Sequence, residues 1–196
     1  MLLKLEHKNP CVASFEFDGS KILELIEKNK ESMITAPNDE YGFGFDNEYL
    51  RSRLDYDVDG YQEAMDPLIE YLESIKNTAV ELLIENSDTK EWPKGRTESI
   101  SKELYLYTIP FIYRPGFYMQ SHKDNRCSVI AGCLNLEEND DVTFFSREWE
   151  GDEVFRCSGT KNKGYMWLNT DDGWHSVDKI VRERKVVIFN FVVALL

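Results

Sequence analysis

Residues 104–114 read LYLYTIPFIYR, residues 127–136 read CSVIAGCLNL, and residues 185–195 read KVVIFNFVVAL. These runs are rich in β-branched and aromatic residues, and their apolar side chains follow the two-residue period of a strand. No helical segment separates them, so they cannot form a parallel sheet with crossover helices, and we expect an antiparallel sandwich or barrel. The full set of predicted strands is 104–114, 127–136, 142–145, 154–157, 164–169 and 185–195.

Upstream of these strands the apolar period is helical. We expect a short amphipathic helix from Ser20, the candidate N-cap, to about Lys30. A longer helix carries an apolar stripe from residue 68 to residue 83; its start is either the pair Asp66-Pro67 or, with a kink at the proline, a point near Tyr61. The helices are expected to pack outside the strands.

The segment Pro37–Gly60 is rich in Asp, Asn, Gly and Tyr, which suits either a lid over a cleft or a plain connector. We expect one integrated domain, in which residues 1–103 form a helical support region and residues 104–196 form the β-rich core.

Composition excludes several classes of protein. The chain has 196 residues and 42% hydrophobic content, enough for a real core. Its net charge of −13, of which −11 falls in residues 1–103, argues against sequence-independent nucleic-acid binding and favours a substrate that is neutral or basic near the site. Four cysteines without a CxxC pair, no secretory signal and no run long enough to cross a bilayer predict a reduced, cytoplasmic setting without membrane contact.

Two of the three histidines belong to a pattern that suits a metal. His122 and Asp124 stand two apart, so on a strand both side chains project from one face. The spacing alone is a weak signal, but it is matched by His175 in the string GWHSV and, nine residues later, by Arg184 at the start of the last strand. Two imidazoles and one carboxylate on a facial triangle are the ligands of non-haem Fe(II) oxygenases.

Four strings extend this pattern across residues 104–196: YRPGFYMQSHKDN (113–125), RCSVIAGCLN (126–135), GYMWLNTDDGWHSV (164–177) and RKVVIFN (184–190). Together they resemble the Fe(II)- and 2-oxoglutarate-dependent dioxygenases, especially the prolyl-hydroxylase-like branch. The resemblance implies an α+β fold with a double-stranded β-helix core, a jelly roll of the cupin kind. It also implies hydroxylation of a prolyl or other residue of a peptide or protein, with succinate and CO2 as products.

The resemblance assigns roles to individual residues. It implies that His122, Asp124 and His175 bind the iron and form the catalytic centre, that Arg184 pairs with the C5 carboxylate of 2-oxoglutarate, and that Tyr113 lies in the pocket wall. The implied cofactors are Fe(II), 2-oxoglutarate and O2, with ascorbate as an optional addition.

Further candidates come from position along the chain. Asn190 is expected to point into the cosubstrate pocket from the last strand. Arg126 is a candidate substrate contact, or else an ion-pair partner of the acidic N-terminal part. Trp174 and Trp167 are each either core or substrate platform.

The sequence also departs from the family pattern. Cys133 stands where relatives often carry a tyrosine that hydrogen-bonds the cosubstrate, and a thiol is a poor donor. Met119 replaces a frequent tyrosine, and Asp140-Asp141 replaces a glycine pair. Lys185 competes with Arg184, because strand alternation lets only one of them face inward; guanidinium geometry favours Arg184.

Other functions remain open at this stage. They are an oxygenase acting on a small molecule, a nucleobase-repair oxygenase, an inactive relative, and a non-enzymatic β-sandwich for sugar binding or particle assembly. The sequence does not define the oligomeric state.

Overall fold

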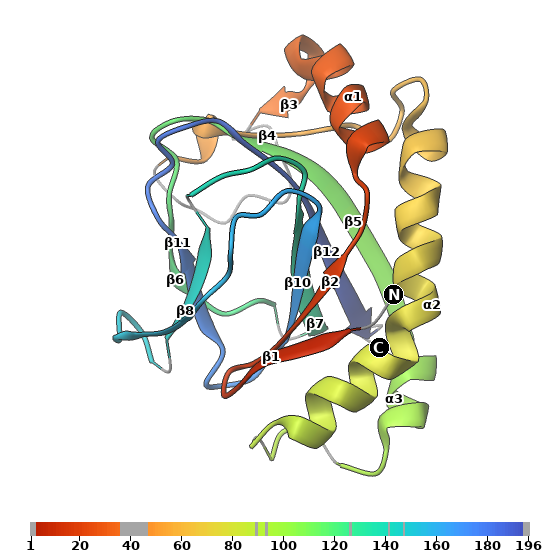
Figure 1. Ribbon diagram of the computed structural model, residues 1–196, viewed down its shortest axis with the longest axis vertical. Helices are drawn as coiled ribbons and strands as arrows, with labels where there is room; N and C mark the ends of the chain where they lie inside the picture. Colours follow the sequence, from red (N-terminus) through yellow and green to blue (C-terminus); the bar gives the residue numbers. More distant parts are fainter. Residues whose placement is uncertain are drawn as a thin grey trace.

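The computed structural model describes residues 3–35, 47–88, 90–92, 94–125, 127–140, 142–146 and 148–193. Two antiparallel sheets face each other, and helix α2 lies along the outer side of the larger one, with α1 and α3 packed against α2 (Figure 1). The large sheet has the strand order β1-β2-β10-β7-β12-β5-β4-β3, and the small sheet has the order β6-β11-β8-β9. The expected α+β jelly-roll fold is therefore confirmed.

The strands of the large sheet come from both ends of the chain. Its members are β1 (Lys4–Lys8), β2 (Cys11–Glu16), β3 (Ile34–Thr35), β4 (Arg51–Arg53), β5 (Leu104–Tyr113), β7 (Ser128–Asn135), β10 (Lys163–Leu168) and β12 (Arg184–Val193). The small sheet comprises β6 (Met119–His122), β8 (Thr143–Ser146), β9 (Glu153–Arg156) and β11 (Trp174–Val177). The helices are α1 (Ser20–Asn29), α2 (Tyr61–Asn86) and α3 (Thr97–Lys102), with single 3-10 turns η1 (Lys30–Ser32) and η2 (Glu48–Leu50).

The six predicted strands all form, within one or two residues at most ends. The sequence did not predict β6 and β11, which carry the two candidate histidine ligands, nor the four strands and α3 that lie before residue 104. Helix α1 starts at Ser20 itself, with Gly19 as its N-cap, so the expected serine cap is wrong. Helix α2 starts at Tyr61, the earlier of the two expected starts, and continues through Pro67.

The segment Pro37–Gly60 is described only from residue 47. That part includes η2 and strand β4, which pairs between β5 and the edge strand β3 of the large sheet, so it is more than a plain connector. The expected lid would involve residues 37–46, and these lie outside the described residues.

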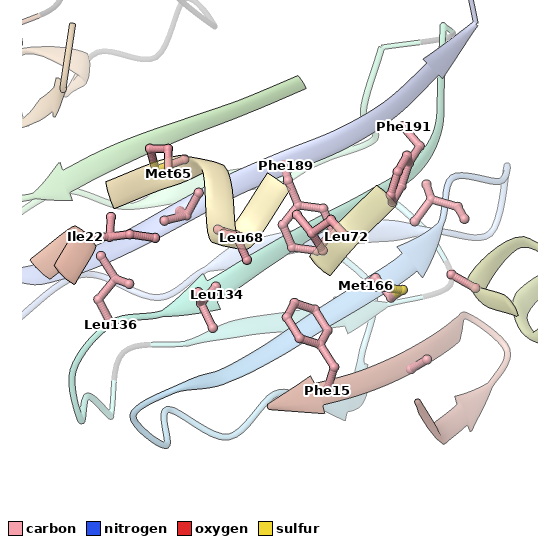
Figure 2. Packing of buried hydrophobic residues seen from close by; sticks show 14 of the residues in the cluster. Phe15, Ile22, Met65, Leu68, Leu72, Leu134, Leu136, Met166, Phe189 and Phe191 are labelled. Carbon is pink, nitrogen blue, oxygen red and sulfur yellow. The ribbon is translucent and has the colours of Figure 1, made fainter. Parts of the chain in front are cut away.

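Both faces of strand β12 are buried, because α2 covers one and the small sheet covers the other. One face presents Val187, Phe189 and Phe191 to the main hydrophobic core, where they pack with Leu68 and Leu72 of α2 (Figure 2). Close approach across this face requires Gly132 on β7, since a Cβ there would lie 2.2 Å from the Phe189 ring. The Phe189 ring therefore lies directly over the main chain of β7.

The opposite face of β12 looks toward the small sheet. Val186 packs there in a second cluster with Phe111 of β5 and Val177 of β11. The space between the sheets is thus lined by residues from both, and the candidate site lies at one part of this interior. Among the described residues, no helix is both long and apolar enough to span a membrane.

Leu68→Ala tests how much the α2 interface contributes to stability. Leu68 is fully buried, so truncation removes apolar contacts and leaves a cavity; we expect the free energy of unfolding to fall by about 2–5 kcal/mol. The matched control on the same helix is Glu70→Ala, at an exposed position, where a change within about 0.5 kcal/mol is expected. Urea unfolding of both variants provides the measurement, and equal effects would contradict the packing described.

Candidate metal centre

Three side chains with metal-ligating atoms meet between the sheets. His122 ends β6 and His175 lies directly opposite it on β11, so the two imidazoles share one face of the small sheet, with ring centroids 4.3 Å apart. Asp124 follows two residues after His122, and its Oδ2 lies 3.6 Å from Nε2 of His175. One ligand atom from each residue lies within 4.8 Å of the others.

Main-chain carbonyls set the tautomer of both imidazoles. Nδ1 of His122 lies 2.8 Å from the carbonyl oxygen of Gln120, and Nδ1 of His175 lies 3.1 Å from that of Gly173. A carbonyl only accepts hydrogen bonds, so each Nδ1 carries the proton and each Nε2 keeps its lone pair. This arrangement is usual for metal-binding histidines, whose second nitrogen donates to a carbonyl or carboxylate.

The electrostatics keep the imidazole of His122 neutral. Burial, followed by the neighbouring His175, lowers the pKa of His122 to about 4 from 6.5, and the nearby Asp124 offsets this only in part. A neutral imidazole is the form that binds a metal, so this residue needs no proton release at neutral pH.

The residues present fit a ferrous ion. Two imidazoles and one carboxylate supply the borderline donors that non-haem Fe(II) accepts. Aromatic rings from both sheets pack beside the cluster: the ring centroid of Trp167 (β10) lies 5.0 Å from that of His175, and that of Phe145 (β8) lies 5.3 Å from that of Trp167.

Arg184 lies on the same interior face, on β12. It stands opposite Tyr113 in the sheet register, its guanidinium carbon is 6.0 Å from the tyrosine ring, and the residue is only 2% exposed. Its Nη2 donates weakly to Asn135 Oδ1 at 3.3 Å, while its buried Nε has no partner in the structure. Among the described residues no carboxylate forms an ion pair with Arg184, so this buried cation is poorly compensated.

Lys185 is oriented to the other side of the sheet. Its Nζ forms ion pairs with Glu27, Glu137 and Glu183 at 2.8, 3.2 and 3.0 Å, and the first of these belongs to α1. Although burial acts in the opposite direction, hydrogen bonds to these carboxylates raise the pKa of Lys185 above its usual range. Of the two adjacent cations, Arg184 is thus the one that faces the interior with unused donors.

The remaining candidates for the cosubstrate pocket also lie on interior positions. Tyr113 and Cys133 are fully buried, and desolvation raises the pKa of both groups. Cys133 stands opposite Ile188 of β12 and Tyr165 of β10. Asn190 is tied by its Oδ1, which accepts from the Ser128 hydroxyl at 2.9 Å.

The structure describes Trp174 but not Arg126 among the two candidate substrate residues. Trp174 is half-buried, packs edge-on against Trp149 at 5.4 Å, and lies under the Lys123 ammonium at 5.2 Å. A surface groove of about 520 Å³ runs along β6, β8 and β11, but its lining does not include the three candidate ligands.

Two residues of this region were not found by sequence reasoning as part of the site. Arg51 of β4 is buried and stands opposite Tyr113 of β5, while Arg184 stands opposite the same tyrosine from β12 on the other side of β5. No sequence motif indicated Arg51. Trp167 was expected to be either core or a substrate platform, yet its Nε1 donates to Asp124 Oδ2 at 3.1 Å. Its place on the interior face of a predicted strand was the only signal available.

The two sheets with this His-Asp-His cluster between them define a double-stranded β-helix of the kind found in prolyl-hydroxylase-like 2-oxoglutarate oxygenases. A scan against protein-family models and a search of curated proteins found no match. Solved structures do match. A Pseudomonas putida prolyl-4-hydroxylase aligns with a TM-score of 0.63 and 14% identity over 94% of this chain and 93% of that one.

Two further structures support the same fold. The viral collagen prolyl hydroxylase of Paramecium bursaria Chlorella virus-1, in a 2-oxoglutarate complex, aligns with a TM-score of 0.59 and 11% identity over 94% and 96% of the two chains. A putative oxygenase from Shewanella oneidensis gives 0.59 and 10% identity over 94% and 82%. At such identities the comparisons establish the fold, which confirms the resemblance at that level.

The pKa of His122 predicts a pH dependence of stability in the metal-free protein. Its value is lower in the folded chain than in the unfolded chain, so between about pH 4 and 6.5 the unfolded state binds more protons. The free energy of unfolding is therefore expected to rise with pH across this window and to keep the full contribution above pH 6.5. His122→Asn removes this contribution. Urea unfolding in the presence of a chelator, from pH 4.5 to 7.5, measures it, and parallel pH profiles of the two proteins would contradict the assignment.

Proposed function

We propose that this protein is an Fe(II)- and 2-oxoglutarate-dependent oxygenase that hydroxylates a prolyl or other residue of a peptide or protein. The observation that carries the proposal is the convergence of His122, Asp124 and His175, whose ligand atoms all lie within 4.8 Å of one another. The prolyl residue is suggested by the names of the structural neighbours, two of which are prolyl hydroxylases.

The three residues would hold the metal, and Fe(II) together with 2-oxoglutarate and O2 would supply the oxidising chemistry at this centre. The protein's own contribution begins with the protons. Each imidazole keeps its proton on Nδ1, bound to a main-chain carbonyl, so ligation requires no change of tautomer. Asp124 supplies the single negative charge of the ligand set.

Arg184 is the residue proposed to orient the cosubstrate. A guanidinium forms bidentate hydrogen bonds with a carboxylate, and Arg184 is buried with its Nε unsatisfied. Binding a carboxylate there would compensate a cation that the described residues leave without an ion pair. Tyr113, Cys133 and Asn190 are proposed to line the same pocket.

Aromatic residues are proposed to shield part of the centre from water. Phe145 and Trp167 close one side of the ligand cluster, and both are almost completely buried. In such an enclosed space the Arg184 guanidinium and the Asp124 carboxylate interact with bound groups more strongly than they would in water. Arg126 and Trp174 are proposed as contacts for the substrate.

Anaerobic metal titration tests the proposed centre. The protein is expected to take up one Fe(II) per chain, to develop a weak visible absorption band on adding 2-oxoglutarate, and to release succinate with proline-containing peptides. Asp124→Ala and His122→Ala should abolish uptake, because two ligands cannot retain the ion, whereas His7→Ala, at the histidine outside the cluster, should not. Uptake that survives loss of Asp124 and His122 would refute the proposal.

A pair of neighbouring substitutions tests the cosubstrate assignment. Arg184→Met is expected to raise the KM for 2-oxoglutarate about 30-fold or more, because a charge-assisted bidentate pair contributes about 2 kcal/mol or more. Lys185→Met likewise replaces one basic residue with methionine. It should lower the free energy of unfolding, because its ion pairs are lost, and change the KM for 2-oxoglutarate far less. Succinate assays over a range of 2-oxoglutarate concentrations measure both. A larger rise in KM for Lys185→Met would assign the role to that residue instead.

A further inference from the structure

The acceptor of the Trp167 hydrogen bond is unusual for a core tryptophan. Trp167 is 4% exposed, stands opposite the small residue Ala131 in the sheet, and has its indole ring against the His175 ring. A buried indole N–H needs an acceptor, and any nearby carbonyl would satisfy it. Here the acceptor is Oδ2 of Asp124, at 3.1 Å.

This hydrogen bond restrains rotation of the Asp124 carboxylate, the one candidate ligand group of the cluster that no main-chain carbonyl fixes. Each imidazole is fixed by its carbonyl partner, but the carboxylate of Asp124 could turn about its terminal torsion. The Trp167 N–H holds Oδ2, which is also the oxygen that lies 3.6 Å from Nε2 of His175. A carboxylate oxygen carries more than one lone pair, so this donation leaves acceptor capacity for a metal.

The end of β10 also holds the main chain on which Asp124 sits. Asn169, two residues beyond Trp167, donates through Nδ2 to the carbonyl oxygens of Asn125 at 3.0 Å and Ser128 at 2.9 Å. The segment after β6 is therefore tied to the large sheet by its main chain as well as by the Asp124 side chain. One strand end determines where the carboxylate lies and how it is turned.

We propose that Trp167 is a positioning residue of the metal centre, which orients the Asp124 carboxylate toward the two histidines before the metal arrives. The inference rests on the proposed function, since it assumes that Asp124 is a ligand. Partners of this kind in other metal sites contribute about 10- to 100-fold in metal affinity. Trp167 thus belongs to the second layer of the site and does not itself contact the metal.

The chain provides a matched control at Trp92. Its Nε1 also donates one hydrogen bond of 3.1 Å, but to the main-chain carbonyl of Asn169 and not to a ligand carboxylate. Trp92→Phe and Trp167→Phe therefore remove the same chemical group and a bond of the same length. Only the second removes it from Asp124.

The experiment measures the affinity for Co(II) of the metal-free wild type and both variants by isothermal titration calorimetry, together with the thermal midpoint of each metal-free protein. Trp167→Phe is expected to raise the Kd about 10- to 100-fold, while Trp92→Phe leaves it unchanged. A purely structural role for Trp167 would lower its midpoint without changing its Kd. If Trp167→Phe does not fold, benzothienylalanine at position 167 keeps the ring shape and removes only the N–H.

The possible outcomes separate this inference from the proposed function. Wild type that binds no Co(II) contradicts the metal centre itself, and with it the role of Trp167. Wild type that binds, with a Kd equal to that of Trp167→Phe or of the benzothienylalanine protein, overturns the inference alone. An equal rise in Kd for both phenylalanine variants also overturns it, because Trp92→Phe leaves the Trp167–Asp124 hydrogen bond intact and the effect would then not come from that bond.

Discussion

The antiparallel pairing of β6 with β11 is the interaction on which the candidate site depends. It places His122 opposite His175, and the small sheet has no other means of bringing together two imidazoles that are 53 residues apart in the chain. Strand β8 pairs with the other side of β11 and puts Phe145 next to His175. The hydrogen-bonded ladder fixes backbone positions far better than a pair of loops would, so the small sheet sets the positions of both histidines.

The large sheet contributes through its two-sided burial. Along β12, alternate residues serve different purposes: Lys185 and Phe189 face the helices, while Arg184 and Val186 face the small sheet. Helix α2 therefore supports the site indirectly, because it packs the outer face of the strand whose inner face carries Arg184. Strand β10 carries Trp167 on its inner face, where the indole N–H donates to Asp124.

Much of this could be predicted from sequence, for physical reasons that differ between elements. Long strands such as β5 and β12 bury many β-branched and aromatic residues, so their composition identifies them. The strands β6 (MQSH) and β11 (WHSV) are four residues long and half polar, so only their pairing with neighbours makes them strands. Short and polar segments of this kind give no periodic signal, although they carry the two histidines.

The candidate site, like the fold, was predictable from the sequence only in part. The residue types and spacing of the His-Asp-His set were visible in the sequence, but the phase of β12, which decides between Arg184 and Lys185, was not. In the folded chain Lys185 pairs with Glu27, Glu137 and Glu183, and two of these partners lie far from it in the sequence. The role of Trp167 was also hidden, because an indole on a buried strand has the same pattern whether it fills space or holds a carboxylate.

The burial of Arg184 links the persistence of the fold to the solution around it. A guanidinium at 2% exposure with an unsatisfied Nε raises the free energy of the ligand-free protein, and any carboxylate that binds there relieves this cost only in the native state. Ligands that bind the native state alone stabilise it in proportion to the logarithm of their concentration. If Arg184 binds a carboxylate as proposed, a higher concentration of that organic acid would make the folded molecule more resistant to proteolysis.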